Sequence, residues 1–119
     1  MGDLTKHFSR SEFACKDGCG SDIINPDLVA KLEALRLLLG EPLVISSGCR
    51  CAARNQKEGG RSDSAHLRGY AADIACKNSR QRWNIVSNAV HLFKRVHLGR
   101  KYVHVDVDEG LPQNVMALS

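Results

Sequence analysis

The spacing of three metal-ligating residues constrains this chain more than any other feature of its sequence. His66 and Asp73 stand seven positions apart, and the stretch between them contains small residues and Gly69. His104 follows far downstream, within a run that alternates apolar and polar residues. Two histidines and one aspartate can form three sides of a tetrahedral zinc site and leave the fourth open for water. The sequence therefore predicts a fold that brings two distant segments together around Zn²⁺.

The size and composition of the chain indicate a single domain over residues 1–119. Hydrophobic residues make up 43% and charged residues 25%, which favours a packed core over disorder. The net charge of +4 is too modest to argue for nucleic-acid binding, although it would suit an anionic polymer such as a bacterial cell wall. No segment reaches the roughly 20 apolar residues that cross a membrane, and the N-terminus lacks the apolar core of a signal peptide. We expect a monomer, cytoplasmic as synthesised, with neither nucleic acid nor membrane as a partner.

Hydrophobic periodicity predicts an α+β fold with two main helices. The first begins after Asn25, has Pro26 at its first position and ends at Gly40. The second begins at Asn78 or Ser79 and runs for about four to five turns. Its expected apolar face consists of Trp83, Val86, Val90, Phe93 and His97.

Three β-prone runs predict a small antiparallel sheet that carries the metal site and packs against these helices. They cover residues 42–46, 70–76 and 100–107. In the last run, a period of two places Tyr102, His104 and Asp106 on one face. Residues 48–64 are expected to form a long irregular loop, and such loops in small domains are often functional. The end of the chain is turn-like, with a marginal tail.

Two charged residues stand at positions that need an explanation. Asp73 lies inside an apolar strand, where a carboxylate needs a cation or hydrogen-bond donors. It could bind a metal, or it could pair with Arg50 or Arg68. Arg50 follows a predicted strand directly, and its guanidinium could hold a substrate carboxylate or serve a structural role.

The five cysteines do not form a recognisable framework. Their odd number and the missing export signal argue against a purely disulfide-built fold. The first four could make a thiolate metal site, but neither pair has the usual spacing. Buried thiols, with one pair able to oxidise, are the simpler interpretation. The residues are Cys15, Cys19, Cys49, Cys51 and Cys76.

Three blocks of the sequence resemble the zinc D-Ala-D-Ala carboxypeptidase family. They are residues 47–50, residues 64–74 with the pattern Ser-x-His-x2-Gly-x3-Asp, and residues 103–106 with the pattern His-x-Asp. Residues 7–15 resemble the start of the short, single-domain branch, so the resemblance covers nearly the whole chain. The family includes phage endolysins that cut peptidoglycan stem peptides, and its zinc fold is shared with the hedgehog signalling domain.

The resemblance implies a zinc metallopeptidase. By this resemblance His66, Asp73 and His104 bind the zinc, Arg50 grips a carboxylate of the substrate, and Ser64 supports the site or the substrate. The substrate would be a D-amino-acid-containing peptide of the cell wall, cut terminally or internally.

The catalytic base is the point at which the chain departs from the family. Many members have an acidic residue three positions before the last histidine ligand, where this chain has Lys101; some have histidine at the position of Tyr102. We therefore expect Asp106 to be the base, although it stands about 6.6 Å along the strand and could instead lie behind the histidine ligand. His97 and His91, both expected on the second helix, are further candidates. Tyr102 could bind the substrate and stabilise its oxyanion.

Two other functions fit the same pattern. One is a zinc-binding or cell-wall-binding module without catalysis. The other is a phage structural protein that keeps the fold as a scaffold. If the chain is instead the peptidase, it could reach the bacterial cell wall by a phage-type lysis route.

Overall fold

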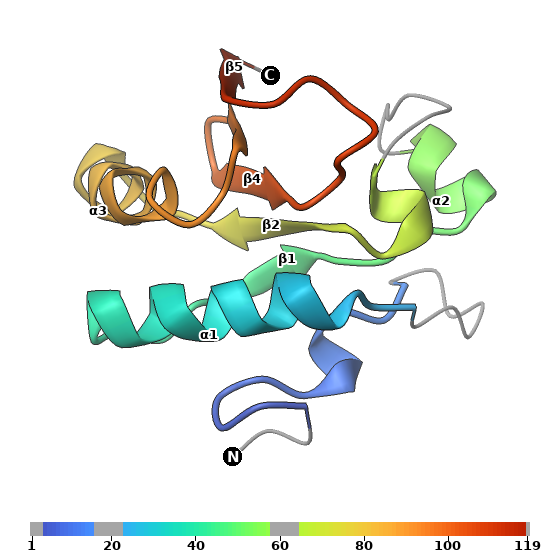
Figure 1. Cartoon of the computed structure of the whole chain (residues 1–119), viewed down its shortest axis with the longest axis horizontal. Coiled ribbons are helices and arrows are strands. Elements are labelled where there is room, and N and C mark those ends of the chain that lie inside the picture. Colours follow the sequence, from blue (N-terminus) through green and yellow to red (C-terminus); the bar gives the residue numbers. More distant parts are fainter. Residues whose placement is uncertain (1–3, 16–22, 58–64, 119) are drawn as a thin grey trace.

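The computed structural model describes residues 4–15, 23–57 and 65–118. They form an α+β fold with a five-stranded sheet in the order β1-β2-β4-β3-β5 (Figure 1). All pairs are antiparallel except β3 and β5, which are parallel. The elements are η1 (Arg10–Glu12), α1 (Pro26–Leu39), β1 (Ile45–Ser47), α2 (Ala52–Lys57), η2 (Ala65–Arg68), β2 (Ala71–Ala75), α3 (Ser79–Ala89), β3 (Arg95–Leu98), β4 (Tyr102–Asp106) and β5 (Val115–Leu118).

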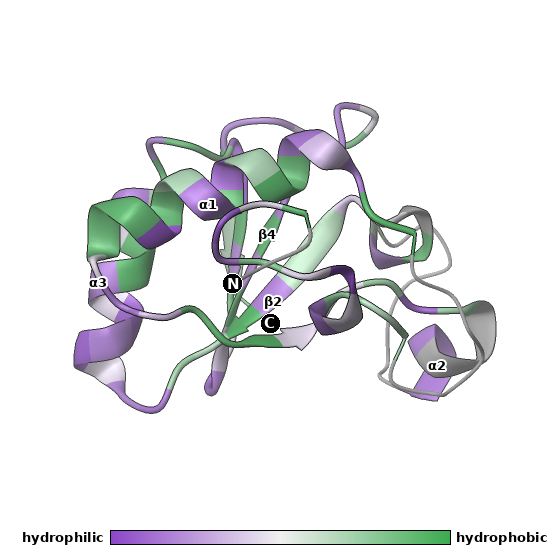
Figure 2. Cartoon of the chain, turned by 90° about the horizontal axis from the view of Figure 1, so that it is seen from below, coloured by the Kyte–Doolittle hydropathy of each residue, from purple (hydrophilic) through white to green (hydrophobic). Residues whose placement is uncertain are grey.

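The hydrophobic core lies between one face of the sheet and the helices α1 and α3. Alternate residues of β2 and β4 point into it, while their neighbours in the sequence point to the other face. Hydrophobic and hydrophilic residues alternate along α1, as expected for a helix with one buried side (Figure 2). The predicted fold class, a sheet packed against two main helices, is confirmed. Core residues include Leu28, Leu32, Leu35, Ile74, Ile85, Val103 and Val105.

The first helix begins and ends as the sequence predicts. The side chain of Asn25 accepts hydrogen bonds from the backbone N–H groups of Asp27 at 2.8 Å and Leu28 at 3.3 Å. Gly40 closes the helix in the left-handed conformation with φ of 69°. Both ends are therefore fixed by local chemistry. In the described part of the chain, every helix is too short or too polar to cross a bilayer.

The prediction for the second helix is wrong at its C-terminal end. Helix α3 ends at Ala89, and residues 95–98 form strand β3 instead. Its predicted apolar face is also displaced, since Trp83 is 72% exposed while Ile85 is buried. No glycine or proline marks the end of α3, and Val96 fits a strand facing the core as well as it fits a helix. Residues 95–98 form a strand rather than a continuation of the helix because they pair with β4.

Three further elements differ from the prediction. Residues 52–57 of the expected loop form the short helix α2. The first strand is shifted to Ile45–Ser47, and the tail contributes β5, which pairs with β3. Strand β5 adds only an exposed edge, with Leu118 86% exposed, so its sequence carries little hydrophobic signal.

Two glycines share the left-handed backbone but not the same surroundings. Gly69 has φ of 72° and Gly40 has φ of 69°. A Cβ on Gly69 would lie 2.3 Å from the carbonyl oxygen of Ile23, whereas one on Gly40 would meet nothing within 4 Å. Gly69 thus lets the turn before β2 pass directly against residues 23–24.

We expect Gly69→Ala to destabilise the fold more than Gly40→Ala. Both changes force a Cβ into a left-handed conformation, at a cost of about 1 kcal/mol. Only Gly69→Ala adds a clash with backbone, for a total of about 2–4 kcal/mol. Urea unfolding of the two variants measures this difference, and equal losses would contradict it.

A carboxylate on α1 holds the N-terminal segment, which lies on the side of α1 away from the sheet (Figure 1). The backbone N–H of His7 donates to Glu33 Oε1 at 2.8 Å, and the ring Nδ1 pairs with Oε2. Burial alone would raise the pKa of Glu33, but the hydrogen bonds with His7 outweigh it and lower the pKa below 4.5. The ionised form is therefore favoured by folding.

We expect Glu33→Gln to lower the free energy of unfolding by about 1 kcal/mol at neutral pH. The lowered pKa means that this stabilisation is fully present above 4.5 and is lost as the pH falls from there through the folded-state value. Urea unfolding from pH 7 to pH 3 tests the trend, with Glu41→Gln as the control because Glu41 is exposed. A difference that stayed constant down to the lowest pH would contradict the assignment.

Candidate metal centre

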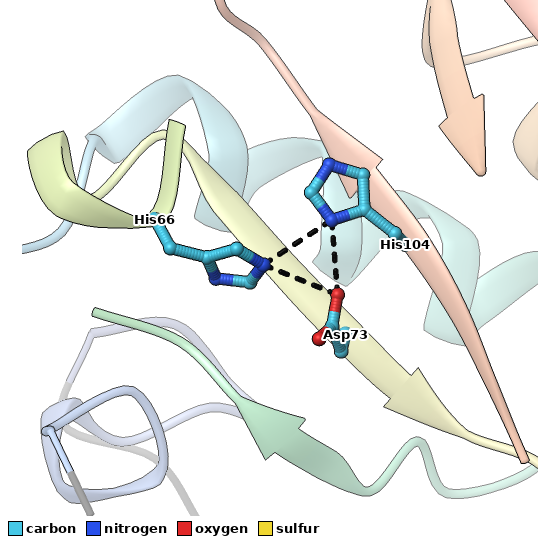
Figure 3. A group of neighbouring side chains, drawn as sticks. All are labelled: His66, Asp73 and His104. Carbon is cyan, nitrogen blue, oxygen red and sulfur yellow. Dashed lines mark hydrogen bonds and ion pairs between the residues drawn. The ribbon is translucent and has the colours of Figure 1, made fainter. Parts of the chain in front are cut away.

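Three side chains meet at one point beside the sheet, on the face opposite the core (Figure 3). His66 Nε2 lies 3.2 Å from Asp73 Oδ1 and 3.2 Å from His104 Nδ1. The third side of the triangle, from His104 Nδ1 to Asp73 Oδ1, is 2.9 Å. His66 and Asp73 are buried and His104 is partly buried. These are the three residues that the sequence predicts as metal ligands.

Strand register brings two of the ligands together. Asp73 of β2 pairs directly with His104 of β4, so their side chains leave the sheet on the same face. Directly opposed residues on antiparallel strands have Cβ atoms about 4.5–5.5 Å apart. His66 comes from η2, immediately before the turn at Gly69 that leads into β2. The site thus combines a strand pair with a short helical turn held against it.

The outer nitrogens of both histidines are held by acceptors. His66 Nδ1 lies 2.7 Å from the Gly48 carbonyl oxygen, and His104 Nε2 lies 2.8 Å from Asp106 Oδ2. Because a carbonyl or carboxylate oxygen can only accept, each outer nitrogen carries the proton. When both imidazoles are neutral, their inner nitrogens, Nε2 of His66 and Nδ1 of His104, carry lone pairs directed at the same point, whereas a protonated imidazole donates from there to Asp73.

The aspartate is oriented in the same way. Arg50 Nη2 donates to Asp73 Oδ2 at 3.0 Å, which leaves Oδ1 facing the histidines. Arg50 is itself held by Ser47 Oγ, 3.0 Å from its Nε, and Asn55 Oδ1, 3.4 Å from its Nη1. Burial alone would raise the pKa of Asp73, but hydrogen bonds with His104 and His66 lower it well below the ordinary range. Asp73 is therefore a carboxylate at neutral pH.

With both imidazoles neutral, the three inner atoms are all acceptors and repel one another unless a cation, either a proton or a metal ion, lies among them. Burial alone would lower the pKa of His104, but the carboxylates of Asp106 and Asp73 raise it, because the site attracts positive charge. Bonds of about 2.0–2.1 Å place the ligands of a tetrahedral zinc about 3.3–3.4 Å apart. The observed 2.9–3.2 Å triangle is close to that size. The donor set and its geometry therefore fit a metal ion.

Comparison with models of known protein families identifies the family to which the chain belongs. The family model for peptidase M15 matches residues 6–107, which include all three candidate ligands. The chain belongs to the peptidase M15 family. This is the zinc D-Ala-D-Ala carboxypeptidase-like family, so the resemblance seen in the sequence is confirmed. None of the curated proteins matches the chain.

Membership of M15 implies a metallopeptidase, and the cluster of His66, Asp73 and His104 gives this member a place for the metal. Hydrolase chemistry therefore agrees with both the family and the geometry.

Asp106, the first candidate for the base, lies behind His104 in this M15 member. Its side chain is fully buried and both oxygens are engaged. Oδ2 contacts His104, while Oδ1 accepts from Arg95 Nε at 2.8 Å and from the Asp108 backbone N–H at 3.2 Å. A carboxylate so enclosed is placed to orient His104, which is the alternative that the sequence left open, and a catalytic role of Asp106 stays a prediction.

The fold brings His97 next to the centre on strand β3, whereas the sequence pattern predicts a helix there. His97 lies opposite His104 in the β3–β4 pair, with ring centroids 4.8 Å apart. Burial and the neighbouring His104 and Arg95 lower its pKa, so the neutral imidazole is favoured. His91, the other histidine expected on that helix, lies in the exposed turn after α3.

The remaining residues that the sequence predicts for the site are not among the three side chains that meet at the centre. Tyr102 shares the face of β4 with His104, and its ring lies over Gly99 in the β3–β4 turn. Ser64 lies outside the described residues, as does the rest of the loop between α2 and η2, residues 58–64. The contacts of Gly48 and Ser47 were not predicted, because a backbone carbonyl or a serine carries no ligand signal in sequence.

We expect Asp106→Asn to weaken metal binding about 10–100-fold. The amide nitrogen can donate to His104 Nε2, which would move the ring proton to Nδ1 and remove the inner lone pair. Competition with a zinc-chelating dye measures the affinity, with circular dichroism to verify folding. The control is Asp108→Asn, the same change at a buried carboxylate that accepts from the Gly110 backbone N–H. Unchanged affinity in Asp106→Asn would contradict this role.

Proposed function

We propose that this chain is a zinc-dependent peptidase that hydrolyses D-amino-acid-containing stem peptides of peptidoglycan. The observation that supports it is the convergence of three acceptor atoms within 3.2 Å, each ligand having its outer atom held by a separate partner. This preorganisation exceeds what a structural ion pair needs. Family membership supports the substrate class.

Zinc is the metal that this donor set suits best. Two imidazoles and one carboxylate form the three-ligand set typical of catalytic zinc, which keeps one position for water. When bound, zinc supplies a Lewis acid that polarises the scissile carbonyl and lowers the pKa of water to about 7. Imidazole-rich sites also accept other divalent metals, so direct metal analysis is part of the test.

Arg50 would serve both the metal ligand and the substrate. Contacts with Ser47, Asn55 and Asp73 account for three of the five N–H groups of its guanidinium. We propose that the others bind a carboxylate of the peptide, which would fix the scissile bond over the centre. In that role, Arg50→Lys would raise KM, because an ammonium keeps the charge but not the bidentate geometry.

His97 is the side chain best placed to move protons. It is half-buried beside His104 on the same face of the sheet, and the β3–β4 register fixes its position. We propose that a ring nitrogen of His97 accepts a proton from the attacking water and returns it to the leaving amine. Tyr102, two residues before His104 on the same face of β4, would contact the substrate on the other side of the centre.

The assignment predicts different outcomes for three histidines. His66→Ala should lose both zinc binding and hydrolysis of a muropeptide. His97→Gln should keep zinc but lower kcat about 10²–10⁴-fold. His91→Ala should change neither, because His91 lies in an exposed turn away from the centre. Zinc content by atomic emission and peptide cleavage by mass spectrometry measure both properties.

Two outcomes would favour the other functions. Wild-type protein that binds zinc and wall peptide without turnover at any pH would be a binding module. Protein that binds no zinc would be a scaffold. Hydrolysis that persists in His66→Ala would refute the proposed site.

A further inference from the structure

Two segments distant in the sequence meet at a pair of thiols beside the centre. Cys15 Sγ lies 3.8 Å from Cys51 Sγ, and the two residues are 36 positions apart. Cys15 is 7% exposed, and Cys51 is half-buried at the end of the segment that follows β1. All four cysteines of the described ranges are in thiol form. We propose that Cys15 and Cys51 form a disulfide that restrains the segment of residues 48–51 beside the metal centre.

The backbone already holds the two segments in alignment. The Cys51 N–H points at Cys15 Sγ at 3.5 Å, and the Cys49 N–H donates to the Phe13 carbonyl oxygen at 2.7 Å. A Cβ on Gly48 would lie 2.6 Å from that same oxygen, so the chains touch directly there. The sulfurs need to approach by less than 2 Å to reach the bonded distance of about 2.05 Å. Side-chain rotation supplies a movement of that size.

The segment from Gly48 to Cys51 carries contacts to two of the three ligands. The Gly48 carbonyl fixes the tautomer of His66, and Arg50 orients Asp73. The Arg50 backbone N–H also donates to the His66 carbonyl oxygen at 3.1 Å. A covalent bond at Cys51 would therefore restrain the segment that preorganises the centre.

The other end of the bond is firmly anchored. Phe8 and Phe13 are buried in the core, with ring centroids 5.8 Å apart, and His7 is tied to Glu33 of α1. Cys15 follows this anchored stretch by two residues. The disulfide would thus fasten the segment after β1 to the core rather than to a loose terminus.

The chemistry needs an oxidant, and a small disulfide such as glutathione disulfide suffices. The Cys51 thiolate, the more exposed of the two, attacks one glutathione sulfur and releases one glutathione thiol. The Cys15 thiolate then attacks Cys51 Sγ and releases the second. One protein disulfide and two glutathione thiols result, so electrons and protons balance. Cys76 is a poor competitor, because burial raises the pKa of its thiol.

The test uses the full chain, reduced and then equilibrated with glutathione disulfide. We expect an intact mass lower by two hydrogens and a cross-linked peptide joining Cys15 to Cys51. Oxidation should raise Tm by on the order of 10 °C, as a bond closing a loop of this length does. It should also slow the extraction of zinc by a chelator. Cys15→Ser should abolish the bond and the rise in Tm, while Cys49→Ser should keep both.

Peptide mapping of the wild-type chain decides the assignment even where a variant fails to fold. A bond to Cys19 or Cys49, a stable glutathione adduct without closure, or thiols that stay reduced would overturn the proposal. So would a second bound zinc that protects Cys15 and Cys51 from alkylation, because the thiols would then be metal ligands. None of these mass measurements depends on peptidase activity, so they stand apart from the proposed function.

Discussion

Asp73 and His104 lie opposite each other because of the apolar residues that flank them. Ala72 and Ile74 of β2, and Val103 and Val105 of β4, are fully buried against the helices. A slip of one residue would turn these apolar side chains to the polar face of the sheet, and Asp73 and His104 into the core. The hydrophobic core therefore fixes the strand register, and the strand register fixes the metal centre. His66, the contacts of Arg50 and the position of His97 all depend on it.

Two buried ion pairs flank the β2–β4 pair at the candidate metal centre. Arg50 holds Asp73 on one side of the centre, and Arg95 holds Asp106 behind His104 on the other. Asp73 and Asp106 thus each have a guanidinium partner, without which their burial would be costly. Arg95 also donates to the Pro112 carbonyl oxygen at 2.7 Å, which connects the C-terminal segment to the outer shell of the site. The candidate ligands are therefore surrounded by a frame of buried ion pairs and hydrogen bonds.

The limits of the sequence prediction have particular physical causes. The first helix has a cap at each end, and both the Asn25 and Gly40 signals act locally. The second helix has a start signal at Asn78 but no stop signal, so its apolar pattern runs on into residues that pair as β3. That error placed His97 on a helix and hid its contact with His104. The contact of the Gly48 carbonyl with His66 could not be predicted, because every residue carries a backbone carbonyl, whereas the pairing of Arg50 with Asp73 was one of the expected alternatives.

The sequence by itself determined the candidate ligand set, the α+β class and the family. His66, Asp73 and His104 are defined by residue type and spacing, and the core by its apolar pattern, which are both properties of the chain. Only the tertiary structure decided where each polar side chain lies and what it contacts. Asp106 was an expected base and lies enclosed behind a ligand, while His97 was an incidental candidate and lies beside the centre. Burial and cross-strand neighbours decide such roles, because they depend on which distant residues the register brings together.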